Sequence, residues 1–208
     1  MFFRFIKQYN YCFFYVIIIL FEGDKMYSLF IDTHSNIINL AIYFDYKLVD
    51  SISINSNNNH SRETMTNISK LLEKNNLNKA LVNELIVVNG PGSFTGIRIG
   101  VTIAKTWAYL ENITIKTINY LELQYYLNNK KNDIYYVKDN KGYYVYFNNE
   151  YFYLTNIEMD NLLLTNNKTL INILVDFEKM GNIFKNIFPT LVHSVNPFYI
   201  KNVSGIND

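Results

Sequence analysis

Cysteine, proline and glycine are scarce in this sequence: its 208 residues include one cysteine, three prolines and eight glycines. The lone Cys12 excludes a disulfide within the chain and any metal site built from several cysteines, a pattern typical of a reducing compartment. Lysine and arginine form no run longer than the Lys130–Lys131 pair, and the formal net charge is +1. A protein that grips nucleic acid by itself carries far more positive charge. We therefore expect a cytoplasmic protein that does not bind nucleic acid alone.

Apolar and aromatic residues, by contrast, are abundant. Hydrophobic residues make up 49% of the chain, which contains 18 tyrosines and 15 phenylalanines. This composition is sufficient for a well-packed core, and the length indicates one domain or two small lobes.

The first 25 residues do not fit a simple pattern. Residues 11–21 are an apolar run preceded by Arg4 and Lys7, but the run is shorter than the roughly 20 residues of a membrane span. No small-x-small cleavage pattern follows it. Because residues 22–26 can be encoded by codons that contain a ribosome-binding sequence, we expect translation to start at Met26. Residues 1–25 are then a doubtful extension with no role at a membrane, and a membrane-anchored module remains the alternative.

From Met26 onward, strand and helix patterns alternate. Three apolar segments joined by short polar turns predict an antiparallel meander, because a short turn joins antiparallel neighbours. Helical spacing and a buried-strand composition then alternate. The predicted strands cover residues 27–31, 37–44, 47–54, 84–88 and 113–118, and the predicted helices cover residues 61–75, 97–110 and 120–127.

This order of elements predicts an α/β fold with a mixed sheet and crossover helices. It is the order of an actin-like ATPase or ribonuclease-H-like lobe, which we assign to residues 26–125. Apolar and polar residues alternate at 134–137, 143–147 and 151–154. We therefore expect a smaller, β-rich and degenerate second lobe at residues 126–208.

The most specific motif is the glycine-rich segment 90–96 (Gly-Pro-Gly-Ser-Phe-Thr-Gly), which joins a predicted strand to a predicted helix. A P-loop has four residues between its glycines and then Lys-Ser/Thr. Here five residues separate Gly90 from Gly96, and Ile97 follows. The dinucleotide fingerprint G-x-G-x-x-G also fails, because the third glycine comes one residue too late.

The loop nevertheless has a physical role. Gly90 and Gly92 permit unusual backbone angles, and Ser93 or Thr95 can cap the following helix. Exposed N–H groups between Gly90 and Gly96 are suited to holding an anion. A rigid connection without a ligand is the alternative.

Small residues recur at every fourth position of the helix after the loop, which allows another backbone to approach closely. Two interpretations are open: the stripe packs on the chain's own sheet or helix 61–75, or it contacts another subunit. For the second interpretation we predict an interface formed by the apolar face of helix 61–75 and by the helix after the loop. Its members are Met65, Ile68, Leu72, Arg98, Gly100, Ala104 and Ala108.

Residues 26–125 resemble the bacterial TsaB (YeaZ) family, whose members take part in forming threonylcarbamoyladenosine in tRNA. The segment 88–100 (Val-Asn-Gly-Pro-Gly-Ser-Phe-Thr-Gly-Ile-Arg-Ile-Gly) carries most of the resemblance. Residues 31–33 (Ile-Asp-Thr), His60-Ser61, residues 120–122 and residues 196–200 also fit. After residue 125 the resemblance is weak.

The resemblance implies an actin-like fold and a subunit of the complex that modifies the adenosine next to the tRNA anticodon. It implies a catalytic paralogue of the TsaD type and a small P-loop ATPase of the TsaE type as partners, with a homodimer when the chain is alone. tRNA would be met only through the complex. The paralogue carries its metal on a His-x-x-x-His helix, whereas here His60 is followed four positions later by Thr64.

We therefore expect no catalytic residue, no metal and no cofactor in this chain. Asp32 and Thr33 are a possible relic of a phosphate site. The alternative function is that of a small actin-like-fold ATPase or kinase, or of a glycoprotease-type hydrolase.

Overall fold

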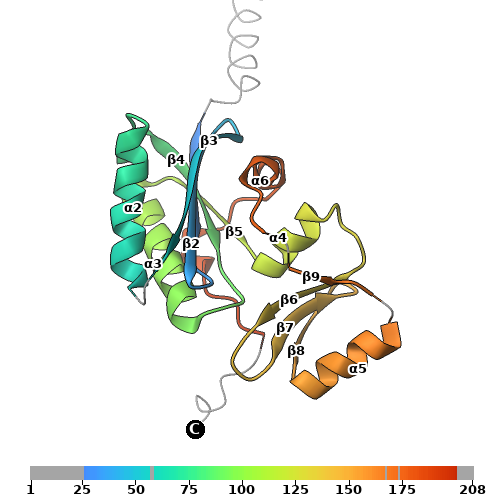
Figure 1. The fold of residues 1–208 in the computed structure, drawn as a ribbon. Coiled ribbons are helices and arrows are strands. Elements are labelled where there is room, and N and C mark those ends of the chain that lie inside the picture. Colours follow the sequence, from blue (N-terminus) through green and yellow to red (C-terminus); the bar gives the residue numbers. More distant parts are fainter. Residues whose placement is uncertain (1–25, 57–58, 167, 173, 201–208) are drawn as a thin grey trace, which may run out of the picture.

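The computed structural model describes residues 26–200, except positions 57, 58, 167 and 173. The doubtful extension predicted at residues 1–25 lies outside the described residues. Two sheets and the helices that cover them make up the described part of the chain (Figure 1).

The first sheet has five strands in the order β3-β2-β1-β4-β5. The strands β1, β2 and β3 form the predicted antiparallel meander, and β4 and β5 run parallel to β1. The strands span Tyr27–Asp32 (β1), Ile37–Phe44 (β2), Lys47–Asn55 (β3), Val82–Val88 (β4) and Thr114–Ile118 (β5). Five of the six residues of β1 are buried, as expected for a central strand covered on both faces.

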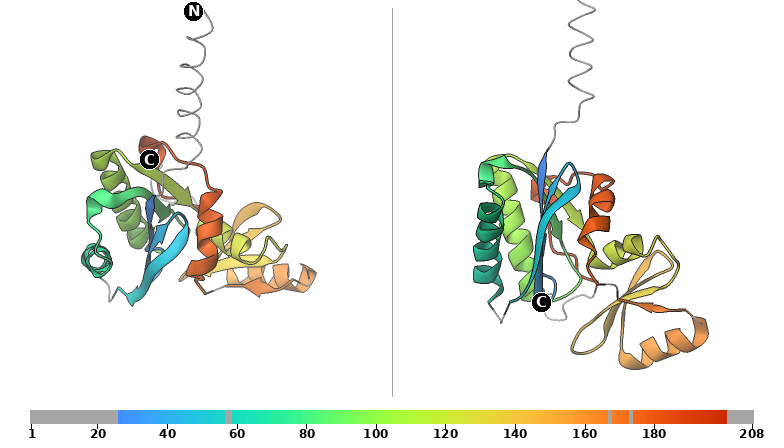
Figure 2. Two further views of the ribbon diagram at one scale, coloured as in Figure 1. Left: turned by 90° about the horizontal axis from the view of Figure 1, so that it is seen from above. Right: turned by 45° about the horizontal axis from the view of Figure 1, so that its top comes forward.

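Helices cover both faces of this sheet. The helices α2 (His60–Lys74) and α3 (Phe94–Glu111) pack on one face, and α4 (Tyr120–Leu127) and α6 (Phe177–Lys185) on the other (Figure 2). Successive residues of β1 point to opposite faces, so Leu29 and Ile31 belong to the first core while Phe30 belongs to the second. All elements predicted between residues 27 and 127 are confirmed, with bounds that shift by up to three residues.

The second sheet is smaller, with the strand order β8-β7-β6-β9. It contains β6 (Ile134–Lys138), β7 (Tyr143–Phe147), β8 (Glu150–Leu154) and the two-residue β9 (Leu170–Ile171). The helix α5 (Asn156–Asn166) packs on one face, where it buries Met159. On the other face, Tyr135 and Tyr146 contact Leu121 of α4, and this contact joins the two sheets.

The last part of the chain returns to the first sheet. The α6 residues Met180 and Phe184 are fully buried beside Phe30. Residues 192–199 then run along α3, where Lys105 Nζ donates hydrogen bonds to the backbone oxygens of His193 (3.1 Å) and Val195 (3.0 Å). The sequence analysis did not predict α5, β9 or α6, and the division of the chain at residue 125 stays a prediction.

Candidate functional site

The glycine loop is held in place by close backbone contacts. Gly90 and Gly92 have φ angles of 132° and 155°, a region that side chains disfavour. A Cβ atom on Gly92 would collide with the backbone oxygen of His34, and one on Gly90 would lie 2.6 Å from the backbone oxygen of Phe198. The Ser93 N–H donates to His34 O over 2.7 Å. The loop is therefore wedged between the end of β1 and the C-terminal segment, and glycine is required at both positions.

Ser93 caps the helix that follows. Its Oγ accepts a hydrogen bond from Gly96 N at 3.2 Å, which confirms one of the two predicted caps. Thr95 instead lies exposed in the first turn. Among the described residues, the backbone N–H groups of Phe94 and Thr95 have no hydrogen-bond partner. The start of α3 thus keeps two free donors beside the loop.

Asp32 lies at the end of β1 and is fully buried. One carboxylate oxygen accepts from His34 Nδ1 (2.6 Å) and His34 N (3.0 Å), and the other accepts from Asn39 Nδ2 (3.0 Å). Burial acts to raise the pKa of Asp32, but the charge and hydrogen bonds of His34, together with Asn39, hold that pKa below its usual value. The carboxylate is therefore ionised, and its hydrogen bonds go to groups of this chain, where it orients the His34 ring.

The Thr33 side chain is also hydrogen-bonded within the chain. Its Oγ1 donates to Gly96 O over 2.7 Å and so ties the end of β1 to α3. Both side chains, of Asp32 and of Thr33, are thus buried and hydrogen-bonded within the chain. Their predicted role as a phosphate-site relic stays a prediction.

A cleft of about 710 Å³ opens in front of this loop. Its walls are the loop after β1, the glycine loop, the β6–β7 hairpin and the C-terminal segment 198–200. The His34 ring lies in the wall and stacks on Tyr120, with ring centroids 3.7 Å apart. Sequence reasoning missed both the cleft and His34, because the hairpin that completes the cleft lies more than 40 residues after the glycine loop.

His60 begins α2 and is buried. Its Nε2 lies 2.8 Å from Ser35 O, and its backbone oxygen accepts from Thr64 Oγ1 at 2.6 Å. Among the described residues, no group of three or more His, Cys, Asp and Glu side chains is placed to hold a metal ion.

The small-residue stripe of α3 faces the chain's own sheet. A Cβ atom on Gly100 would collide with Thr33 Oγ1, and Ala104 and Ala108 are buried in the core with Ile68 and Leu72 of α2. These five members of the predicted interface therefore pack against other residues of this same chain. The remaining two, Met65 and Arg98, are exposed. The interface as a set stays a prediction.

An apolar groove of about 420 Å³ runs between α2 and α3. Met65 is 46% exposed and Leu110 is 72% exposed, although both are large apolar side chains. Ile103 and Trp107 line the groove between them, and the ion pair of Lys79 with Glu111 (2.9 Å) lies at its edge. Sequence reasoning named Met65 but missed the α3 wall, which the i, i+4, i+7 spacing of residues 103, 107 and 110 could have indicated.

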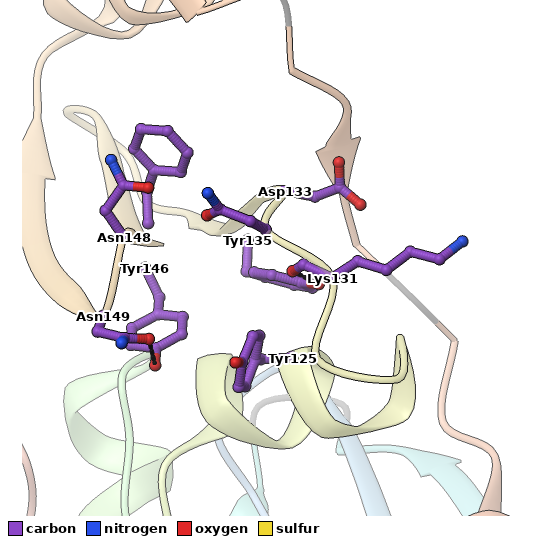
Figure 3. A pocket seen from close by; sticks show the side chains of 9 residues that line it. Tyr125, Lys131, Asp133, Tyr135, Tyr146, Asn148 and Asn149 are labelled. Carbon is purple, nitrogen blue, oxygen red and sulfur yellow. Dashed lines mark hydrogen bonds between the residues drawn. The ribbon is translucent and has the colours of Figure 1, made fainter.

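A third cavity, of about 330 Å³, lies where α4 meets the second sheet (Figure 3). Tyr125 of α4 points toward Tyr135 and Tyr146 of the strands, with ring centroids 5.8 Å and 5.5 Å away. Tyr135 and Tyr146 are almost fully buried and belong to the core that joins the sheets. We interpret this cluster as packing, because its rings already contact one another.

Sequence comparison places residues 49–149 in a match to the family model described as "TsaD: tRNA N6-adenosine threonylcarbamoyltransferase". The "tRNA threonylcarbamoyladenosine biosynthesis protein TsaB" of Bacillus subtilis is 33% identical over 97 residues, which cover 47% of this chain and 42% of that protein. The "Uncharacterized protein MG208 homolog" of Mycoplasma pneumoniae is 36% identical over 102 residues, covering 47% of this chain and 52% of the relative. The chain thus spans about half the length of the curated relatives it matches.

Two solved structures share the fold. A Pseudomonas aeruginosa protein with similarity to peptidase YEAZ superposes with a TM-score of 0.62, and YeaZ from Pseudomonas aeruginosa with 0.60, each at 13% identity. The superpositions cover 85% and 84% of this chain and 100% and 99% of the two structures.

This is therefore an α/β protein with the fold of YeaZ, which is actin-like and ribonuclease-H-like. The sequence matches include a TsaB protein and a TsaD-family model, and together with the shared fold they support a TsaB/YeaZ-type protein. The resemblance first seen in the glycine-loop motif is confirmed. Within the described residues, no helix is both long enough and apolar enough to cross a membrane.

Proposed function

We propose that this chain is a non-catalytic subunit of the complex that forms N6-threonylcarbamoyladenosine next to the tRNA anticodon. Similarity to TsaB and to the TsaD family supports a role in this modification. The observation that carries the proposal is the apolar groove between α2 and α3. Both helices lie entirely inside the segment that matches the family model.

The groove suits a protein partner. Met65 and Leu110 expose apolar surface on opposite sides of a groove whose floor includes Ile68 and Leu72. An apolar helix of a partner would cover these side chains, and each would gain the exposed share of the about 1.5–3 kcal/mol that full burial of such a side chain is worth. The partner we propose is a catalytic paralogue of the TsaD type, with a second copy of this chain as the occupant when the paralogue is missing. A P-loop ATPase of the TsaE type completes the complex.

The residues of this chain favour a non-catalytic, supporting role over a catalytic one. The position that would supply a second metal ligand on α2 is Thr64, whose hydroxyl is committed to His60 O. With a net charge of +1, the chain would meet tRNA only through the complex, in the cytoplasm.

Association is the direct test, and it calls for residues that are exposed in the free chain. Met65→Asp and Leu110→Asp each place a charge in the groove and should weaken co-purification of the paralogue at least tenfold. Leu164→Asp is the matched control, because Leu164 is 84% exposed on α5, outside the groove. Pull-down with the tagged paralogue measures the first effect, and light scattering of the isolated chain measures the homodimer. Unchanged association in both groove variants would overturn the docking proposal.

The purified chain and its groove variants also distinguish the alternative, enzymatic function from the supporting role. An ATPase, kinase or hydrolase would show turnover with the isolated chain, and the cleft with its Asp32–His34 pair is where such chemistry would lie. Turnover that is lost in His34→Gln but kept in the groove variants would favour the enzyme over the supporting subunit.

A further inference from the structure

A groove of about 430 Å³ lies between α3 and the C-terminal segment 195–199. We call it the cationic groove, because Arg98 and Lys105 line it and no carboxylate of the described residues does. The sequence explains this imbalance: the stretches that contain the two walls, residues 85–110 and 179–200, include neither aspartate nor glutamate. Within the described part of the chain, neither cation belongs to an ion pair. The groove therefore carries two positive charges that no carboxylate neutralises.

Both cations are held in position. The guanidinium of Arg98 lies over the Phe94 ring, 3.8 Å from its centroid, and Arg98 Nε donates to the Tyr199 hydroxyl over 3.1 Å. The two terminal nitrogens of Arg98 donate to no other described residue, so that end of the guanidinium fork is free. Lys105 Nζ donates to two neutral backbone oxygens of the C-terminal segment (3.1 and 3.0 Å) and keeps its full charge. Side chains that are already ordered lose little entropy when they bind a ligand.

Hydroxyl groups and aromatic rings lie beside the cations. Thr102 and Thr106 are exposed one helical turn apart on α3, and both line the cationic groove. In nucleic-acid complexes, threonine hydroxyls, arginine and lysine all donate to phosphate oxygens. Phe94 is 44% exposed and Tyr199 is 41% exposed, with ring centroids 5.5 Å apart. Unpaired bases stack on rings of this kind, so the surface combines the features that bind single-stranded RNA.

The cationic groove borders the apolar groove between α2 and α3. Thr102 and Thr106 line both, so the two grooves lie on either side of one ridge of α3. A protein seated on the apolar groove reaches this ridge, and RNA held by that protein would lie next to Arg98 and Lys105. Two cations alone bind RNA only weakly, which is consistent with the net charge of +1 and with a surface shared between two subunits.

We infer that the cationic groove contacts a single-stranded part of the RNA substrate within the complex. Arg98 and Lys105 bind its phosphates, and Tyr199 stacks on an unpaired base. The inference rests on the proposed function, because that function supplies the RNA and places the paralogue beside the groove. An acidic segment of a protein would satisfy the two cations equally, so the test must separate these two occupants.

Fluorescence anisotropy with an unmodified anticodon stem-loop RNA tests the inference on the complex of this chain with its paralogue. Arg98→Gln and Lys105→Gln should each weaken binding about fourfold at about 0.15 M salt. Each should also lower the slope of log affinity against log salt by about 0.7, the value of one phosphate contact with a single strand. Arg62→Gln on α2 and Lys130→Gln after α4 are exposed controls outside the cationic groove. Equal affinities and slopes in variants and controls would overturn the inference.

Stacking has its own signature in the same titration. Tyr199→Leu should weaken RNA binding about fivefold and leave the salt slope unchanged, because the variant removes a ring but no charge. Tyr126→Leu is the matched control, since Tyr126 is 36% exposed on α4, away from the groove. Unchanged affinity in Tyr199→Leu would contradict an RNA strand as the occupant.

Co-purification of the paralogue separates failure of this inference from failure of the proposed function. If Arg98→Gln and Lys105→Gln lose the paralogue, the groove contacts protein and the RNA inference is overturned. If the unaltered chain does not bind the paralogue, the docking proposal fails, and the isolated chain is titrated with the same RNA at low salt, where phosphate contacts are strongest. Weak binding that Arg98→Gln lowers and Arg62→Gln does not would uphold the RNA contact, and absence of binding would overturn it.

Discussion

Single atoms decide what the small residues of α3 do. Gly100 faces Thr33 so closely that a side chain at this position has no space, and Thr33 Oγ1 is at the same time bonded to Gly96 O. The spacing of small residues on α3 indicated that another backbone segment approaches the helix closely. It did not indicate which segment, because small residues are equally suited to contact with the chain's own strand and with a partner helix. The structure identifies the end of β1 as the neighbour.

Gly100→Leu should consequently destabilise the fold. Overpacking at a site of this kind costs about 1–3 kcal/mol, and here the loop that contains Gly92 would be displaced as well. The midpoint of urea unfolding measures the loss, with Thr106→Leu on the exposed side of the same helix as the control. Normal stability combined with lost association would instead favour a direct role of Gly100 in a partner interface.

Elements of the first sheet could be predicted because their patterns are clean. The strand β1 is apolar throughout, and the turns on either side of β2 are short and polar, so both the order and the meander followed from the sequence. The helix α5 lacked such a pattern, because it buries only Met159 and leaves Ile157 and Leu164 exposed. The helix α6 did carry one, with Asp176 at its N-cap and apolar residues at spacings of three and four. It was missed because its partner surface includes Tyr43 of β2, which lies 134 residues before Phe177 in the chain.

A buried ion pair connects α6 to that sheet. Lys116 Nζ lies 2.8 Å from Glu84 Oε2 and donates to the backbone oxygen of Phe184 at 3.0 Å and to the Tyr46 hydroxyl at 2.7 Å. Both charged side chains are at most 5% exposed. Burial raises the pKa of Tyr46, so its hydroxyl stays protonated and accepts from Lys116 while donating to Glu84.

Lys116→Met should therefore cost about 3–5 kcal/mol, since it leaves the Glu84 carboxylate buried without its cation. The double variant Lys116→Met/Glu84→Gln should recover part of that loss, because the remaining buried group is then neutral. The exposed pair of Lys79 and Glu111 provides the control, and Lys79→Met should cost less than about 1 kcal/mol. Thermal and urea unfolding of the four proteins measure these differences. A double variant no more stable than Lys116→Met would argue against an uncompensated charge as the cause.

At the scale of the whole molecule, the two candidate sites lie on different parts of the fold. The groove lies between α2 and α3 with Lys79 at its edge, whereas the cleft needs the glycine loop of the first sheet and the hairpin of the second. The motif predicted from the sequence therefore borders a site that the sequence could not complete, since residues 138–141 reach it only through the tertiary fold. The contact between the sheets is made chiefly by Leu121, Tyr135 and Tyr146.

Docking through the groove should therefore survive the loss of the second sheet. Val145 is fully buried in the core between the second sheet and α5, so Val145→Asp places an unpaired charge there and should unfold that sheet. Hydrogen exchange should then show lost protection over residues 134–154 and retained protection over the first sheet. Such a variant should still bind the catalytic paralogue through the α2–α3 groove. Loss of this binding, with the first sheet still protected, would mean that the second sheet contributes to docking.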